Sequence, residues 1–179
     1  MDSGAGLVPA STGWFVMNAR DARWFNQPGR GDSLPLTGCD EFEAEMFFPI
    51  LGMSIQVLPP GKPNGTYHWE TEQEDFLVLA GEALLIVEGQ GRPLRQWDFI
   101  HCPPQTRHVF VGVGDRLCVV LTTSSRQFQK DGPWGFYCAD EAARRYNASA
   151  PEDTQDAEVA YRRFPPSQPK RYRPGLLPD

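Results

Sequence analysis

Apolar and polar residues alternate in the first half of the chain, and this alternation predicts strands. Between residues 51 and 57 every second position is Leu, Met, Ile or Val, and the positions between them are Gly, Ser and Gln. Residues 42–48 show a less regular form of the same pattern. Successive side chains of a strand point to opposite faces, so both stretches are typical of strands with one buried face.

Short apolar runs follow one another closely between residues 76 and 122, with turn residues such as Gly81, Gly89 and the Pro103-Pro104 pair between them. No helical periodicity interrupts the series. Many short strands at close spacing favour an antiparallel sandwich or barrel, so we expect an all-β protein. The expected strands are residues 14–17, 42–48, 51–57, 76–80, 83–87, 94–96, 99–102, 108–111 and 116–122.

The run from Phe76 to Leu79 is apolar at consecutive positions, and therefore on both faces of its strand. Such a strand is covered on each side, either by a second sheet or by another subunit. Together with the long C-terminal tail, this leads us to expect a homodimer, with exchange of the tail or of an edge strand between subunits.

The last third of the chain has a different character. Asp140 is a suitable N-cap for a short helix over residues 141–146, which Asn147 could end. A second short helix is expected over residues 154–163, with acids early and arginines late. The expected organisation is a flexible N-terminus at residues 1–13, a barrel at residues 14–125, and a helical and extended tail at residues 126–179.

Composition narrows the function classes. At 179 residues the chain has the size of one domain with a tail, and its net charge of -6 gives no broad basic surface, so nucleic-acid binding is not expected. No apolar run approaches the roughly 20 residues of a membrane span, and the first residues lack the features of a signal peptide. The four cysteines show no CxxC spacing. We therefore expect a reduced, cytoplasmic protein that does not bind membranes.

Candidate chemistry is concentrated between residues 68 and 108. His68 and His108 flank the strand-rich region, and a Glu-rich run that includes Glu70 and Glu74 follows His68 directly. Histidines and carboxylates on neighbouring strands could converge on one point and bind a metal ion. His101 alternates with its neighbours along its strand and is expected to face away from that point.

These residues resemble the two motifs of the cupin superfamily. In the first motif a histidine, a glutamate and a closing glycine are matched at the family's spacing by His68, Glu74 and Gly81, and in the second motif Pro103 and His108 match. The resemblance covers residues 51–122. It implies a double-stranded β-helix, also called a jelly-roll or cupin barrel, in which His68, Glu74 and His108 are metal ligands.

The sequence departs from the cupin motifs at five positions. Glu70 stands where the family has its second histidine. Trp97, Gln105 and Gly112 replace two glycines and an asparagine of the second motif, and Gly61 lies one residue too far from the first histidine. The segments at residues 14–18, 22–24 and 171–178 are similar to those of single-domain bacterial cupins with the conserved barrel called cupin 2, which mostly lack an assigned activity.

Glu70 is the residue that decides the chemistry of the expected site. If it binds the ion, two carboxylates cancel the charge of a divalent metal, and the centre favours harder ions such as manganese or iron(II) more than a three-histidine site does. Zinc and nickel are also candidates. If Glu70 does not bind, it can act as a general base beside the ion or point to solvent. Glu70 is therefore a candidate ligand and a candidate catalytic residue.

Further residues are expected around this site. Its wall is expected to include some of Phe76, Val78, Phe110, Met53 and Ile55, with Tyr67 and Trp69 near the mouth.

Three functions remain open at this level. The first is a metal-dependent enzyme of oxygenase or isomerase type that acts on a small polar molecule. The second is a non-catalytic cupin that binds a small molecule. The third is a metal-free epimerase with His68 or His108 as general base beside a carboxylate. A cupin that has lost its metal would instead keep these histidines as buried, hydrogen-bonded residues.

Overall fold

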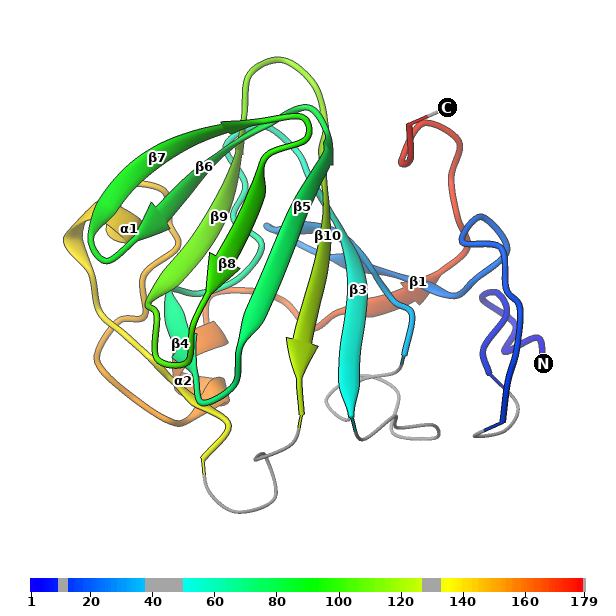
Figure 1. The fold of residues 1–179 in the computed structure, drawn as a ribbon, viewed down its shortest axis with the longest axis horizontal. Coiled ribbons are helices and arrows are strands. Elements are labelled where there is room, and N and C mark those ends of the chain that lie inside the picture. The colour runs from blue at the N-terminus through cyan, green and yellow to red at the C-terminus, as the bar shows by residue number, and fades with distance from the viewer. Residues whose placement is uncertain (10–12, 38–49, 127–132, 179) are drawn as a thin grey trace.

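Two antiparallel sheets pack face to face around the core of the protein (Figure 1). The computed structural model describes residues 1–9, 13–37, 50–126 and 133–178. The larger sheet has the strand order β12 (Gln168–Lys170), β1 (Trp24–Gln27), β2 (Gly31–Pro35), β3 (Leu51–Leu58), β10 (Cys118–Ser125), β5 (Glu74–Ala80) and β8 (Phe99–Cys102). The smaller sheet has the order β11 (Gly135–Tyr137), β4 (His68–Glu70), β9 (His108–Val113), β6 (Glu82–Val87) and β7 (Gln90–Arg95).

The interior between the sheets is filled by apolar side chains from both of them. Phe76 and Val78 on β5 meet Leu85 on β6 and Phe110 on β9, and all four are buried. This packing confirms the predicted all-β barrel, and it follows from the alternation read in the sequence, because every second residue of these strands points inward.

Most of the predicted strands are present, with shifts of a few residues at their ends. The exceptions are instructive. Residues 14–17 form no strand, and Trp14 and Val16 are each 92% exposed, so that prediction is wrong: these two apolar side chains are not covered by the core, and their burial cannot stabilise a strand here. The strand predicted at residues 42–48 lies outside the part of the chain that the structure describes.

The outer face of the larger sheet is covered by the chain's own ends. Ile55 and Val119 on this face form a cluster with Trp24 of β1 and with Leu176 near the C-terminus. The strand β12 also pairs with β1, which places the C-terminal segment at the sheet edge (Figure 1). The apolar second face of the central strands is therefore buried, at least in part, by segments of the same chain.

Both predicted helices are present but short. Asp140 caps α1 (Glu141–Arg144), and its carboxylate accepts a hydrogen bond from the backbone N–H of Ala143. Asn147 has a φ of 55°, the left-handed conformation expected after a helix end. The helix α2 (Ala157–Tyr161) begins later than predicted, because Asp156 rather than Thr154 is its N-cap.

Three positions relevant to the cupin motifs have positive φ angles. Gly81 has a φ of 73°, and a Cβ atom there would lie 2.3 Å from the carbonyl oxygen of Leu117. Trp97 and Gln105, which replace motif glycines, have φ angles of 76° and 69°. The backbone thus keeps the conformation of a glycine at both positions although the side chains differ, at a cost of order 1–3 kcal/mol each.

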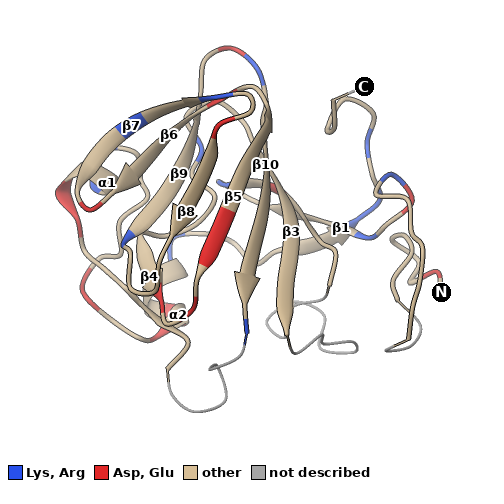
Figure 2. Ribbon diagram, viewed as in Figure 1, with Lys and Arg blue, Asp and Glu red and all other residues tan. Residues whose placement is uncertain are grey.

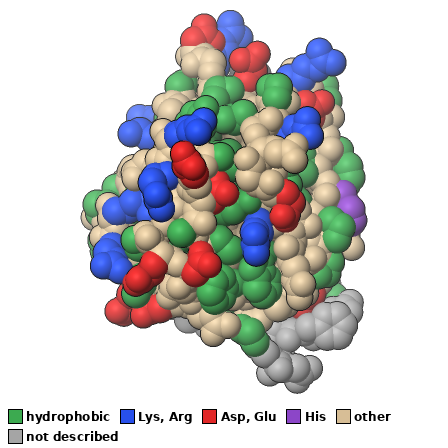
Figure 3. Space-filling view, turned by 90° about the vertical axis from the view of Figure 1, so that its left-hand side faces the viewer, with side chains coloured by type: hydrophobic (Ala, Val, Ile, Leu, Met, Phe, Trp, Pro, Cys, Tyr) green, Lys and Arg blue, Asp and Glu red, His purple; other side chains and the backbone are tan. Residues whose placement is uncertain are grey.

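Charged side chains of both signs are distributed over the elements of the fold (Figure 2). On the face shown in Figure 3, basic and acidic side chains are interspersed with apolar ones, so this face presents no field of a single sign. Within the described ranges, no helix is long and apolar enough to cross a membrane.

Candidate metal centre

Two neighbouring strands of the smaller sheet bring two histidines together. His68 at the start of β4 pairs in register with His108 at the start of β9, and the centroids of their rings are 5.0 Å apart. His108 is only 1% exposed, and the side chain of His68 is 12% exposed. Both rings point into the barrel, as the alternation along each strand requires.

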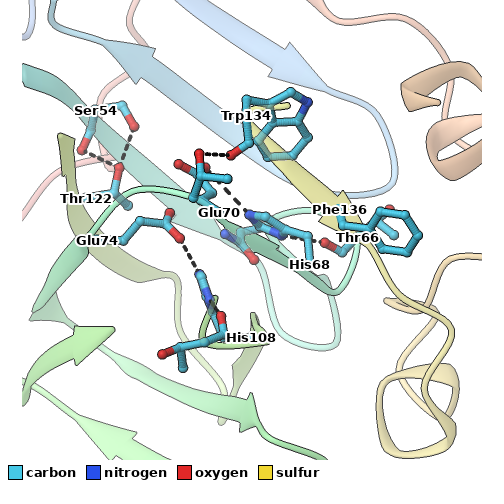
Figure 4. Close-up of polar contacts among 12 residues, drawn as sticks. Ser54, Thr66, His68, Glu70, Glu74, His108, Thr122, Trp134 and Phe136 are labelled. Carbon is cyan, nitrogen blue, oxygen red and sulfur yellow. Dashed lines mark hydrogen bonds and ion pairs between the residues drawn. The ribbon is translucent and has the colours of Figure 1, made fainter. Parts of the chain in front are cut away.

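Each ring is held in one tautomer by a backbone carbonyl two residues upstream. The Nδ1 atom of His68 lies 2.7 Å from the carbonyl oxygen of Thr66, and Nδ1 of His108 lies 3.0 Å from that of Thr106. A carbonyl oxygen can only accept, so each Nδ1 carries the proton and donates it. The lone pair of each imidazole is consequently on Nε2, the nitrogen that faces the carboxylates (Figure 4).

Glu74, the first residue of β5, reaches the histidines from the opposite sheet. Its Oε2 atom lies 3.4 Å from Nε2 of His108 (Figure 4). One donor atom from each of His68, Glu74 and His108 lies within 4.8 Å of the others. Ligands bound to a single ion at about 2.1 Å are about 3 to 4 Å apart. The three residues therefore form a cluster that could bind a metal after small side-chain movements.

Glu70 lies at the edge of this cluster. Its Oε1 atom is 3.8 Å from Nε2 of His68, and its side chain is 16% exposed. Burial raises the pKa of Glu74 well above its usual range, and the negative charge of Glu70 and a hydrogen bond shared with Glu70 raise it further. The two carboxylates are thus close enough to repel each other when both are ionised.

The chemistry of the donor set fits a divalent cation. Burial and the neighbouring His68 lower the pKa of His108 to about 3, so this imidazole is neutral and able to coordinate. In the described part of the chain, neither Glu70 nor Glu74 forms an ion pair with a lysine or arginine. A buried carboxylate without a cationic partner is costly, and a divalent ion would offset the charge of both.

Aromatic side chains surround the histidines. The ring of Phe76 lies 5.2 Å from that of His108, and Phe110 packs against both, as the sequence predicted. Trp134 and Tyr137 approach His68, with centroids at 5.8 Å and 6.1 Å. The last two belong to the segment around β11, whose apolar run Trp-Gly-Phe-Tyr is visible in the sequence. Nothing in that run indicated that it pairs with β4.

Four residues expected at the site lie elsewhere. Tyr67 and Trp69 alternate with His68 and therefore belong to the cluster on the outer face of the smaller sheet, where Tyr67 is 1% exposed. Ile55, and Met53 two positions before it, point to the outer face of the larger sheet. These four side chains therefore lie on the sides of the sheets that face away from the metal centre. Val78, by contrast, lies in the interior as predicted.

His101 lies away from the metal centre. It is on the outer face of β8, its side chain is 48% exposed, and its Nδ1 atom lies 2.6 Å from Oδ1 of Asp75. This placement agrees with the alternation read from the sequence.

The helix α2 supports the histidine on β4 through Thr66. Arg163 donates from its Nη2 atom to the hydroxyl of Thr66 at 3.2 Å, and from Nη1 to the carbonyl oxygen of Ser149 at 2.6 Å. The Thr66 hydroxyl in turn donates to the carbonyl oxygen of Ala160. Because the carbonyl of the same Thr66 accepts the proton of His68, the C-terminal segment fixes the backbone that orients this ring.

Comparison with known protein families gives a match to the central part of the chain. Residues 54–124 match the sequence profile of the Cupin domain, and this range includes all four candidate site residues. The barrel of this chain is thus similar to the cupin domain over these residues, and its two antiparallel sheets agree with the jelly-roll fold expected from the sequence. None of the curated proteins matches the chain.

Solved structures with a similar fold come from several bacteria. A protein from Acidithiobacillus ferrooxidans, described provisionally as a sugar phosphate isomerase, is 28% identical over 43% of this chain and 51% of its own, with a TM-score of 0.42. The DMSP lyase DddQ from Ruegeria pomeroyi is 25% identical over 52% of this chain and 45% of its own, with a TM-score of 0.43. A sugar phosphate isomerase from Silicibacter pomeroyi is 24% identical over 61% and 62%, with a TM-score of 0.44. The match thus spans about half the length of the first two.

Proposed function

We propose that this protein is a metal-dependent enzyme acting on a small polar molecule, with a divalent ion held by His68, Glu74 and His108 and with Glu70 as a fourth ligand or as a base. The observation that carries the proposal is the orientation of the two imidazoles. Both Nδ1 atoms donate to backbone carbonyls, which leaves each Nε2 lone pair facing a carboxylate, Glu70 for His68 and Glu74 for His108. Neither carboxylate forms an ion pair with a lysine or arginine in the described structure.

The metal ion, the aromatic side chains and Glu70 would each have a separate role in such a reaction. A bound divalent ion would supply Lewis acidity toward an oxygen of the substrate. Phe76 and Phe110 exclude water from the side of the barrel behind His108. Glu70 is the more exposed of the two carboxylates, so it is the group placed to take up or deliver a proton at the substrate. Reactions that move a proton on a small molecule, such as isomerisation, match this arrangement, and oxygen-dependent cleavage requires in addition an iron or manganese ion.

Metal analysis of the purified protein tests this function directly. We expect about one divalent ion per chain, manganese, iron, zinc or nickel, measured by elemental analysis after gel filtration. A protein that remains metal-free after incubation with each of these ions would refute the proposal, because the two carboxylates would then have no cationic partner to explain their position.

Substitutions of Glu70 distinguish a ligand from a base. If Glu70 is a ligand, Glu70→His should shift the preference from manganese toward zinc or nickel, since imidazole is a softer donor than a carboxylate. Glu70→Gln should weaken metal binding by roughly 10- to 100-fold. If Glu70 is a base, both variants should keep the metal affinity and lose turnover. Competition titrations with two metals separate the outcomes, and Glu82→Gln, on an exposed position of β6, is the control.

The low pKa of His108 bears on the metal-free alternative. A general base works best when its pKa is close to the working pH. Since burial lowers the pKa of His108 to about 3, this residue is a weak base in the metal-free protein. The metal-free epimerase would therefore depend on His68.

A further inference from the structure

Besides the metal centre, the barrel interior carries a second group of polar side chains, on β3 and β10. Ser54, Gln56 and Leu58 of β3 share a face, and Leu58 belongs to the interior core, so all three side chains point inward. On the neighbouring strand β10, Thr122 points inward together with the buried core residue Val120. We call Ser54, Gln56 and Thr122 the hydroxyl wall.

The hydroxyl wall lies next to the metal centre. Thr122 pairs in register with Ser54 on one side and with Phe76 of β5 on the other, and Phe76 contacts His108. Figure 4 shows Ser54 and Thr122 beside Glu74, on the side of that carboxylate away from His108. A molecule bound near the four candidate ligands would reach this wall.

The wall offers hydrogen-bond acceptors that the chain does not use fully. The side-chain oxygen of Gln56 is buried and has no hydrogen-bond partner among the residues that the structure describes. The hydroxyl groups of Ser54 and Thr122 lie 2.7 Å apart, so one donates to the other, and lone pairs remain on both oxygens. A buried acceptor without a donor costs free energy unless a ligand or water supplies one.

Solvent reaches this part of the interior. Ser54, Gln56 and Thr122 are all partly exposed, whereas their interior neighbours Phe76 and Val120 are buried. The polar positions are therefore less tightly covered than the apolar positions beside them.

We infer that the hydroxyl wall recognises a small molecule with two or more adjacent hydroxyl groups, which donate to Gln56, Ser54 and Thr122 while the molecule lies against the metal centre. This inference rests on the proposed function and names its substrate class. With a divalent ion bound, the charges of Glu70 and Glu74 are balanced, so the centre itself selects no net charge on the ligand. The shared chemistry is the hydroxyl pair, on a neutral polyol or on a hydroxy acid.

Matched pairs of probes test this recognition. D-xylose and tetrahydropyran have the same ring, with and without hydroxyl groups, and glycerate and propionate have the same acid chain, with and without hydroxyl groups. Binding to zinc-loaded protein is measured by saturation-transfer NMR and calorimetry. We expect a hydroxylated probe to bind and its hydroxyl-free partner not to bind, and the two pairs distinguish a polyol from a hydroxy acid. Equal binding within both pairs, or no binding by xylose and glycerate, would overturn the inference.

Variants of the wall provide the second test. Thr122→Val and Gln56→Leu remove hydrogen-bonding groups at nearly constant volume, and each should weaken the Kd of the bound probe on the order of threefold to tenfold. Thr123→Val is the matched control, because Thr123 lies on the outer face of the same strand and donates to the carbonyl oxygen of Asp75. An equal Kd in all three variants would overturn the inference.

The zinc content of every sample separates this inference from the proposed function. If the wild type takes up no metal but still binds a hydroxylated probe through Thr122, the wall is supported and the enzyme proposal fails. If the metal binds and the wall variants change nothing, the wall is refuted and the metal centre stands.

Discussion

Replacing His108 with alanine should lower the metal affinity of the protein by at least about 100-fold. His108 is the most buried member of the cluster, its Nε2 atom lies 3.4 Å from Glu74, and its Nδ1 atom is fixed by Thr106. An ion that loses this nitrogen retains ligands from β4 and β5 only, and water cannot replace the lost nitrogen in the same fixed geometry. Calorimetric titration of metal into the stripped protein measures the change.

The control for this variant is His101→Ala. His101 is a histidine of the same barrel, but it lies on the outer face and contacts Asp75, so its removal should leave metal affinity unchanged. A second substitution, His108→Gln, preserves more of the side-chain volume and guards against a loss of binding caused by a cavity beside Phe76. Retention of full affinity in both His108 variants would show that the ion, if any, binds elsewhere.

The second large effect is a dependence of stability on pH that metal reverses. Without metal, the pKa of Glu74 is raised in the folded state, so the folded protein retains a proton that the unfolded chain releases above about pH 4.5. The stability that Glu74 contributes is fully present below its pKa in the unfolded chain. It is lost as the pH rises toward the pKa of Glu74 in the folded protein. Over this range the free energy of unfolding falls by up to about 1.4 kcal/mol per pH unit.

His108 acts in the opposite direction over a different range. Its pKa falls from 6.5 in the unfolded chain to about 3 in the folded protein, so its stabilising contribution is present above pH 6.5 and declines as the pH falls below that value. Between about pH 4.5 and 6.5 the two slopes oppose each other, since both groups then differ in protonation between the two states. We therefore expect the metal-free protein to lose stability below about pH 4.5, where His108 acts alone. Between pH 4.5 and 6.5 it should gain less stability than His108 alone would give it, because Glu74 opposes the gain.

Bound metal should stabilise the folded protein more strongly as the pH rises. Coordination requires an ionised Glu74, so the ion gains affinity as the pH rises, and the increase in Tm on adding zinc or manganese should be larger at pH 8 than at pH 6. Glu74→Gln should abolish both the opposing slope that Glu74 gives to the stability of the metal-free protein above about pH 4.5 and the gain from metal. Urea unfolding with and without metal provides the data. The same dependence of stability on pH above pH 4.5 in wild-type apo-protein and in Glu74→Gln would contradict the expected role of Glu74.

The core of the candidate site could be predicted because three residues match the cupin motifs, and the resemblance implies that they are ligands; the alternation along their strands agrees with it. His68, Glu74 and His108 lie on strands whose alternation fixes the inward face, and the spacing of the motif residues places the three strands around one point. The same logic failed for Tyr67 and Trp69, since their neighbours in the sequence suggested the site although odd and even positions of a strand face opposite ways.

Other features depended on contacts between distant segments and were beyond the sequence. The approach of Trp134 to His68 results from the pairing of β11 with β4, across more than 60 residues of chain. The hydroxyl wall was equally hidden, because Ser54 and Gln56 were read as the polar, solvent-facing side of an amphipathic strand. In the structure that side faces the barrel interior, and the apolar side packs beneath the two ends of the chain.

The support of His68 by Thr66 and α2 affects how the protein can be dissected. A fragment ending at Ser125 would contain every candidate ligand, yet it would lack Arg163, the β11 strand and the backbone groups that hold the loop before β4. In such a fragment the Thr66 carbonyl would be free to turn and His68 could change its tautomer. A minimal cupin barrel cut from this chain is therefore a poor substitute for the whole molecule in any measurement of metal selectivity.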